Sequence, residues 1–245
     1  MYLPEAFAAR DPVELAGFIA RFPLGLLVAS APMNEAAPGQ SGVAGPSAHL
    51  VPFDYLPPAH ADAEGGGGLL RAHVARANPV WREAAGTQVL VVFQGPQAYV
   101  SPSSYPGKAE HGKVVPTWNY AMVQARGALR VVDDAAWLRA QVTQLTATHE
   151  ASRPVAWSPD DAPQDYIEAL LRAIVGIEIR VSSLVGKWKL SQNRPLEDRR
   201  GVLEALRADE ADPTPGVTAV SASHWLQDTM QAQLPGRTQA GGDDA

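Results

Sequence analysis

Cysteine is absent from the 245 residues of the chain. The protein therefore cannot form a disulfide, use a thiolate as nucleophile, or hold zinc or an iron–sulfur cluster through sulfur ligands. Long apolar runs are also missing, so no segment is long enough to span a bilayer as a helix. The first residues, MYLPEAF, lack the basic start and apolar stretch of a signal peptide. We expect a soluble cytoplasmic protein that does not enter a membrane.

A surplus of positive charge is missing as well. The chain has 20 lysine and arginine residues against 26 acidic ones, which gives a net charge of −6. Proteins that bind DNA by themselves neutralise many phosphates with basic side chains, and no helix-turn-helix pattern is evident here. We therefore expect DNA binding to be weak or indirect. The dense basic cluster of the sequence comprises Lys187, Lys189, Arg194, Arg199 and Arg200.

The sequence also gives little support for a metal site or a hydrolase. Its six histidines are scattered, and no pair has the i, i+4 spacing of two ligands on one helix face. We expect no metal ion, although His49 and His73 could approach each other on neighbouring strands, which leaves haem ligation as an alternative. The serines at 101, 103 and 104 lack the Gly-x-Ser-x-Gly context of a nucleophile elbow.

The pattern of apolar residues and turn residues predicts an α+β fold that is mainly β. The chain has 21 glycines, 21 prolines and a hydrophobic fraction of 46%, enough for a sizeable core. Strict alternation of strands and helices is absent, which favours a mostly antiparallel barrel with peripheral helices. We expect one domain over residues 1–208 and a tail over 209–245 that is partly disordered. Strands are expected over residues 24–30, 48–56, 69–74, 89–93, 98–101, 120–132, 175–181 and 184–190, and helices over 11–22, 78–85, 133–149, 164–174 and 195–208, with a weak helical patch around 225–234.

The stretch from Val89 to Val132 holds the most informative pattern. Two β-rich runs flank Gln94-Gly95-Pro96, which predicts a hairpin. A long polar loop follows, and long loops inside compact domains are usually binding loops or disordered segments. We expect a binding loop because it is rich in aromatic, basic and amide residues, namely Tyr105, Lys108, His111, Trp118 and Asn119.

Three segments are candidate binding sites, each with a plain structural alternative. A strand ends near His73 and a helix begins at Asn78-Pro79, so Arg76 and free backbone N–H groups could hold a phosphate. An ordinary strand–helix junction explains the same residues. Trp118 could form the wall of a ring-binding pocket, with Thr117 and Asn119 as hydrogen-bonding groups, or it could simply pack beneath the loop. The segment Lys187–Arg194 could clamp a ligand phosphate, face DNA, or be a solvated surface.

Several blocks of sequence together resemble one known family. In chain order these are MYLPEAF, AHLVPF, AHVARANPVW, VLVVFQGPQAYVSPSSY, VPTWNYAMVQARG, IVGIEIRV and KWKLSQNR. Blocks of this kind in this order resemble the PaiB family of FMN-binding negative transcriptional regulators. The resemblance covers about residues 1–206. It implies a split β-barrel of the flavin-reductase and pyridoxamine-phosphate-oxidase type, and a homodimer with FMN at the subunit interface. The insert between Ser30 and Ala48 and the tail after Asp209 depart from the family pattern.

The resemblance also implies a cofactor site. It places the FMN phosphate at the junction that begins at His73, and it leaves a flavin-dependent oxidoreductase, such as an NAD(P)H:flavin reductase or an oxidase, as the alternative to a regulator. Haem handling is a third alternative. The residues expected to bind FMN are His49, His73, Arg76, Ala77, Asn78, Thr117, Trp118, Asn119, Lys189, Gln192 and Arg194.

Overall fold

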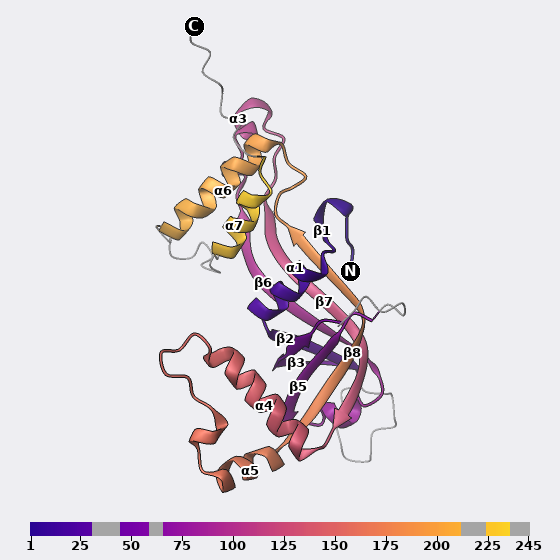
Figure 1. Cartoon of the computed structure of the whole chain (residues 1–245). Coiled ribbons are helices and arrows are strands. Elements are labelled where there is room, and N and C mark those ends of the chain that lie inside the picture. Colours follow the sequence, from indigo (N-terminus) through magenta and orange to yellow (C-terminus); the bar gives the residue numbers. More distant parts are fainter. Residues whose placement is uncertain (31–44, 59–65, 212–223, 236–245) are drawn as a thin grey trace. The chain divides into compact units, whose positions relative to one another are not determined.

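The computed structural model describes residues 1–30, 45–58, 66–211 and 224–235 (Figure 1). Its contacts divide the chain into two compact units. Unit 1 comprises Met1–Ala9, Gly95–Met122 and Lys187–Ala245, and unit 2 comprises Arg10–Gln94 and Val123–Gly186. Three long strands have residues in both units: β6 (Gln88–Val100), β7 (Thr117–Val132) and β8 (Ile174–Lys189). The sequence-based boundary after residue 208 coincides with neither unit.

One eight-stranded sheet forms the centre of the fold. Its strand order is β3-β2-β6-β7-β8-β5-β4, and β1 (Ala8–Ala9) pairs with β8. The pairs β2/β3, β2/β6, β4/β5 and β5/β8 are antiparallel. In unit 2, β3 also contacts β5, so the two ends of the strand order approach each other. The predicted mainly β split barrel with peripheral helices is confirmed. The shorter strands are β2 (Leu24–Ser30), β3 (Pro46–Pro52), β4 (Asp54–Leu56) and β5 (Leu69–Ala75).

The strand β5 shows how alternation builds the core of unit 2. Leu70, Ala72 and Val74 are buried. Arg71 and His73 lie on the opposite face because successive side chains of a strand point to opposite sides. Arg71 and the candidate His73 therefore share one face of β5.

Two of the helices begin at side-chain caps, within the ranges predicted from the sequence. Asp11 accepts a hydrogen bond from the backbone N–H of Val13 at 3.0 Å, and Asp134 accepts one from Trp137 at 2.7 Å. Short 3-10 turns span Glu5–Phe7, Pro102–Ser104 and Pro159–Asp161. None of the helices within the described ranges is long and apolar enough to cross a membrane. The helices are α1 (Pro12–Arg21), α2 (Val80–Glu83), α3 (Gly107–His111), α4 (Ala135–Glu150), α5 (Gln164–Arg172), α6 (Leu196–Ala211) and α7 (His224–Ala232).

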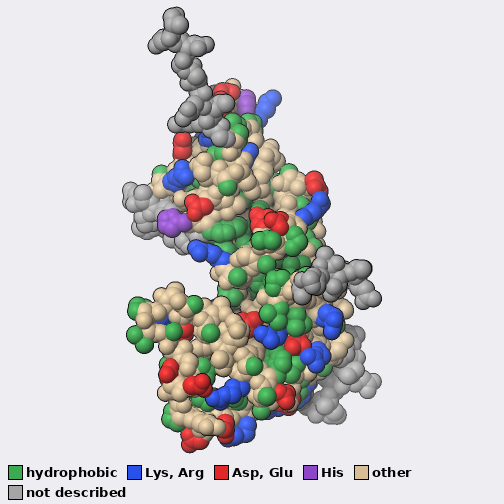
Figure 2. Space-filling view, viewed as in Figure 1, with side chains coloured by type: hydrophobic (Ala, Val, Ile, Leu, Met, Phe, Trp, Pro, Cys, Tyr) green, Lys and Arg blue, Asp and Glu red, His purple; other side chains and the backbone are tan. Residues whose placement is uncertain are grey.

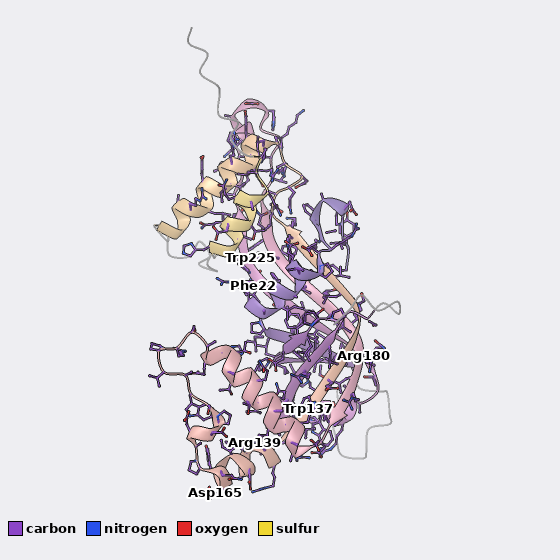
Figure 3. All side chains as sticks on the ribbon, in the orientation of Figure 1. Phe22, Trp137, Arg139, Asp165, Arg180 and Trp225 are labelled. Carbon is purple, nitrogen blue, oxygen red and sulfur yellow. The ribbon has the colours of Figure 1, made fainter. Side chains whose placement is uncertain are left out.

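The position of α4 depends on a glycine in β8. A Cβ atom at Gly176 would lie 2.4 Å from the ring of Trp137, so only glycine leaves room for that ring. Trp137, which Figure 3 marks on α4, also donates its ring N–H to Glu178 at 3.0 Å. Residue 141 lies one turn further along the same helix face. Gln141 is thereby held against β5, where it is 1% exposed.

Three strand predictions were wrong in their boundaries. The predicted hairpin at Gly95-Pro96 is absent, because β6 runs through this point as one strand. Pairing of its first half with β2, where Gly25 lies opposite Phe93, outweighs the local turn preference. The strands predicted at 175–181 and 184–190 form the single strand β8. The strand predicted at 48–56 is divided, because Pro46–Pro52 pairs with β2 whereas Asp54–Leu56 pairs with β5.

Part of the C-terminal segment is folded into unit 1. The helical patch expected around 225–234 corresponds to α7, whose Leu226 and Met230 are buried. Arg199 on α6 donates to the backbone oxygen of Gln233 at 2.6 Å, which fixes the end of α7. Residues 212–223 and 236–245 lie outside the described part of the chain, as does most of the insert after Ser30.

Candidate functional site

In unit 2, His49 is part of a directed chain of hydrogen bonds. Asn78 Oδ1 accepts the backbone N–H of Val80 at 3.0 Å, so its amide nitrogen faces His49 Nδ1 at 3.4 Å. That nitrogen of the His49 ring must then be the acceptor. The proton lies on Nε2, which donates to Ser47 Oγ at 3.1 Å. Both ring nitrogens of His49 are therefore committed to protein groups.

A second chain fixes His73 in the opposite tautomer. Gln141 donates its amide N–H to Asp54 Oδ2 at 3.2 Å, because an ionised carboxylate can only accept. Its Oε1 consequently faces His73 Nδ1, at 2.8 Å. The proton of neutral His73 lies on Nδ1, and Nε2 is left as an acceptor. This atom has no partner among the described residues.

Arg76, the third candidate of this unit, is held by protein groups. Its Nη1 and Nη2 donate to the two carboxylate oxygens of Asp133 at 2.9 and 2.7 Å. Nε donates to Arg172 O at 2.9 Å, and Nη2 also donates to Ile174 O at 3.0 Å. The hydrogen bonds from Arg76 lower the pKa of Asp133 below its usual value. The arginine therefore ties β5 to the start of α4 and the end of α5.

The backbone at the start of α2 would bind an anion more weakly than the start of a long helix would. α2 has four residues, so the dipole expected at its start is small. Ala77 is an exposed residue whose backbone N–H has no acceptor among the described residues, so it is an open donor in this turn. Asn78 uses its side chain as the cap of Val80 and the donor to His49.

In unit 1, Lys189 lies at the centre of a cationic group. Its Nζ donates to Thr117 Oγ1 and to the backbone oxygen of Trp118. Burial lowers the pKa of Lys189, and the nearby charges of Lys187 and Arg194 lower it further. Lys187 is 7% exposed and donates to Tyr2 O at 3.1 Å. No carboxylate pairs with these three cations among the described residues.

Aromatic rings surround the same cations. The Lys187 nitrogen lies 5.4 Å from the centre of the Tyr120 ring, and the Arg194 guanidinium lies 5.1 Å from that of Tyr105. Tyr105 is buried, and burial raises its pKa. Such contacts stabilise a cation without neutralising its charge. The group can therefore attract an anion.

Asn119 and Gln192 are committed to the interior of unit 1. Asn119 is fully buried, accepts from Ser191 Oγ at 3.1 Å, and directs its amide at the Met230 sulfur at 3.8 Å. Gln192 accepts from Leu190 N at 2.7 Å and donates to Trp188 O at 2.6 Å. Their hydrogen bonds shape the turn after β8, where Ser191 has a φ of 66°. This positive φ is rare for a residue other than glycine.

Trp118 presents the open aromatic surface of the predicted binding loop. It is 42% exposed, and its ring meets that of Tyr99 edge to face at 5.8 Å between centroids. Tyr105 and Asn119, by contrast, belong to the core. Lys108 and His111 of this loop are exposed. The loop is thus partly structural, and Trp118 is its aromatic side chain that remains available to a ligand.

The structure connects the candidates within each unit. Asn78 contacts His49 in unit 2, and Lys189 contacts Thr117 and Trp118 in unit 1. Sequence reasoning missed Gln141, Asp54 and Asp133, which hold the candidates of unit 2. Gln141 lies 68 positions from His73 and Asp133 lies 57 from Arg76, so no local signal links them. The hydrogen bonds of these three residues form only in the folded chain.

Two members of the basic cluster are not open surface cations. Lys187 is buried, and the guanidinium of Arg199 is bound to α7. On the face in view in Figure 2, lysine and arginine side chains occur beside acidic ones. No group of three or more potential metal ligands occurs among the described residues.

Comparison with known proteins gives related sequences and structures. Residues 1–183 match a family described as "Putative FMN-binding domain". An uncharacterized protein of Aspergillus fumigatus is 38% identical over 172 residues, which are 57% of this chain and 66% of the relative. This chain thus spans just under two thirds of that relative.

A bacterial relative and a solved structure complete the comparison. "Protease synthase and sporulation protein PAI 2" of Bacillus subtilis is 33% identical over 168 residues, which are 67% of this chain and 75% of the relative. The flavocytochrome Anf3 of Azotobacter vinelandii is 12% identical with a TM-score of 0.49, over 74% of this chain and 69% of that protein.

Proposed function

Since this chain belongs to the PaiB family of FMN-binding proteins, we propose that it is an FMN-dependent negative regulator of transcription. The observation that carries the proposal is the family match over residues 1–183, which indicates FMN as the cofactor. The regulatory part is supported by the likeness to the Bacillus subtilis protein, whose name refers to protease synthesis and sporulation. Bound FMN supplies a ring that can be reduced and reoxidised.

The junction from His73 to Asn78 is the proposed contact for the FMN phosphate. It lies inside the matched range and offers the open N–H of Ala77. The side chains of Arg76 and Asp133 are 36% and 53% exposed, so a phosphate can compete with Asp133 for the guanidinium. Neutral His73 presents only an acceptor at Nε2 and would have to be protonated to donate to a phosphate. His49 positions Asn78 rather than offering a free ring nitrogen.

The second proposed group of FMN contacts lies in unit 1. The exposed face of Trp118 suits a flat aromatic ring. Lys189 and Arg194 suit an anionic group because no described carboxylate neutralises them. Gln192 and Asn119 would act by fixing the turn that carries these cations. Lys189, Gln192 and Arg194 lie beyond residue 183, so the family match does not include them.

We also propose a homodimer. In unit 2, Leu24 and Leu50 are 54% and 66% exposed on the paired strands β2 and β3, and β3 ends the strand order. Exposed apolar strands at a sheet edge are normally covered. Light scattering at low micromolar concentration should give twice the 26.0 kDa of one chain. A folded, flavin-bound monomer would contradict the dimer.

The proposed regulator acts on DNA weakly or through a partner. The chain has 20 basic residues and 26 acidic ones, and its densest basic cluster is partly buried. Proteins with such a charge balance gain little DNA-binding free energy from the release of counterions from the phosphates. The state of the bound FMN is the proposed signal.

The visible spectrum of the purified protein tests the function. We expect flavin bands that persist without turnover when NADPH is added in air. Bands that bleach on addition of NADPH and return as oxygen is consumed would instead establish a flavin-dependent oxidoreductase. A haem spectrum, or no affinity for added FMN, would overturn the proposed cofactor.

A further inference from the structure

A cleft of about 960 Å³ opens in unit 2 among α1, β4 and α4. Figure 1 labels α1 and α4. Its walls are largely apolar. Val13 of α1 is 79% exposed and Leu56 of β4 is 39% exposed, so apolar side chains face open space here. Small-molecule sites have volumes of about 300–1,000 Å³ and combine apolar walls with a few polar groups. The apolar lining includes Val13, Ala16, Ala20, Phe53, Leu56 and Leu145.

Arg71 supplies a positive charge to this apolar cleft. Its Nε is buried and has no hydrogen-bond partner. Within the described ranges, the guanidinium forms no ion pair, whereas Arg76, Arg130 and Arg139 each pair with a carboxylate. A partly buried guanidinium without an acceptor is uncommon because unmade hydrogen bonds are costly. Arg71 can therefore offer its donors to a ligand.

Two carboxylates flank Arg71 across the sheet but are bound elsewhere. Asp54 on β4 and Glu178 on β8 lie opposite Arg71 in the strand register. Asp54 accepts from Gln141, and Glu178 accepts from Arg130 and Trp137. Their negative charges nevertheless limit the positive potential of the cleft. A singly charged ligand is thus favoured over a dianion such as a phosphate monoester.

We propose that the cleft binds a monocarboxylic acid with an aromatic or branched apolar body. The carboxylate would pair with the planar guanidinium of Arg71, which matches its geometry. The apolar body would lie against α1 and β4. Asp54 also lines the cleft and is linked through Gln141 to His73, so the site adjoins the proposed FMN contacts of unit 2. The proposal does not depend on FMN binding.

The test titrates the FMN-saturated full-length chain with 3-phenylpropionate and, separately, with its neutral amide by calorimetry. We expect the acid to bind about tenfold to hundredfold more tightly than the amide, as a charge-assisted contact implies. Arg71→Met should abolish this preference. Arg126→Met is the matched control because Arg126 is exposed on β7 and does not line the cleft. Thermal unfolding and the flavin spectrum of each variant confirm that it is folded and bears FMN.

A second pair of variants tests the cleft without changing its charge. Gly17 lines the cleft, and a Cβ atom there would meet nothing within 4 Å. Gly17→Leu should place a bulky side chain against the apolar wall of the cleft and weaken the binding of both probes at least tenfold, whereas Gly17→Ala should change binding little. Equal affinity for acid and amide, or equal effects of Arg71→Met and Arg126→Met, would overturn the proposal. Loss of FMN with retained binding of the acid would count against the cofactor site alone.

Discussion

Gln141 holds His73 in one tautomer through a hydrogen bond of 2.8 Å. The relay works because ionised Asp54 accepts the Gln141 amide N–H and thereby orients the whole amide group. His73 keeps an acceptor at Nε2 while neutral and gains a donor there when it takes up a proton. The same relay links the face of β5 that carries the FMN candidates to the cleft beside Arg71.

Replacement of Gln141 should release the His73 ring. Gln141→Leu removes the acceptor of Nδ1–H and the donor to Asp54, so the ring should populate both tautomers. Nitrogen-15 shifts of His73 measure this directly, with Gln144→Leu on the exposed face of α4 as control. We also expect a loss of about 1–3 kcal/mol of unfolding free energy, because Asp54 and His73 lose a buried partner. An unchanged tautomer would show that another group orients the ring.

Arg76 and Asp133 should have opposite effects on FMN affinity. Arg76→Ala removes a charge-assisted contact to the phosphate and should weaken FMN binding about tenfold to hundredfold. Asp133→Asn removes the competing carboxylate and should strengthen binding. Titration of the flavin-free protein with FMN measures both. If both variants weaken binding equally, Arg76 serves only to connect β5 with α4 and α5.

Replacing the cations of unit 1 shows whether they bind FMN or contact DNA. Simultaneous change of Lys187, Lys189 and Arg194 to glutamine should lower FMN affinity and leave DNA binding unaltered. Fluorescence anisotropy of labelled promoter DNA at two salt concentrations should show weak, salt-dependent association for the unaltered protein. Nanomolar, sequence-specific binding by the protein alone would instead indicate direct repression.

Lys189 should make stability depend on alkaline pH. Its folded-state pKa lies below the ordinary value of 10.5, mainly through burial. Between that lowered pKa and 10.5, the unfolded chain binds more protons than the folded one, so stability contributed by this group rises with pH. Chemical denaturation of the protein and of Lys189→Met across this window should show the rise only when Lys189 is present. An anion bound beside Lys189 should raise the folded-state pKa of this lysine. The pH range over which stability rises should then become narrower.

The sequence alone determined the element types and several of their ends. The helices predicted over residues 11–22 and 133–149 are α1 and α4, which Asp11 and Asp134 cap, and β3, which contains Pro52, lies at the end of the strand order. Caps and prolines act on the nearest few residues, so their effects can be predicted from a short window. The blocks of sequence and their order likewise indicated the family and its cofactor.

Only the tertiary structure decided which side chains are available. Strand pairing made β6 and β8 continuous where local signals predicted breaks. Asp133 reaches Arg76 and Gln141 reaches His73 across separations of 57 and 68 residues. Such hydrogen bonds exist only after the sheet has brought distant segments together, and each takes up a donor or acceptor that the sequence presents as free. For the same reason, Arg71 forms no ion pair among the described residues, because Asp54 on β4 and Glu178 on β8 accept hydrogen bonds from other groups.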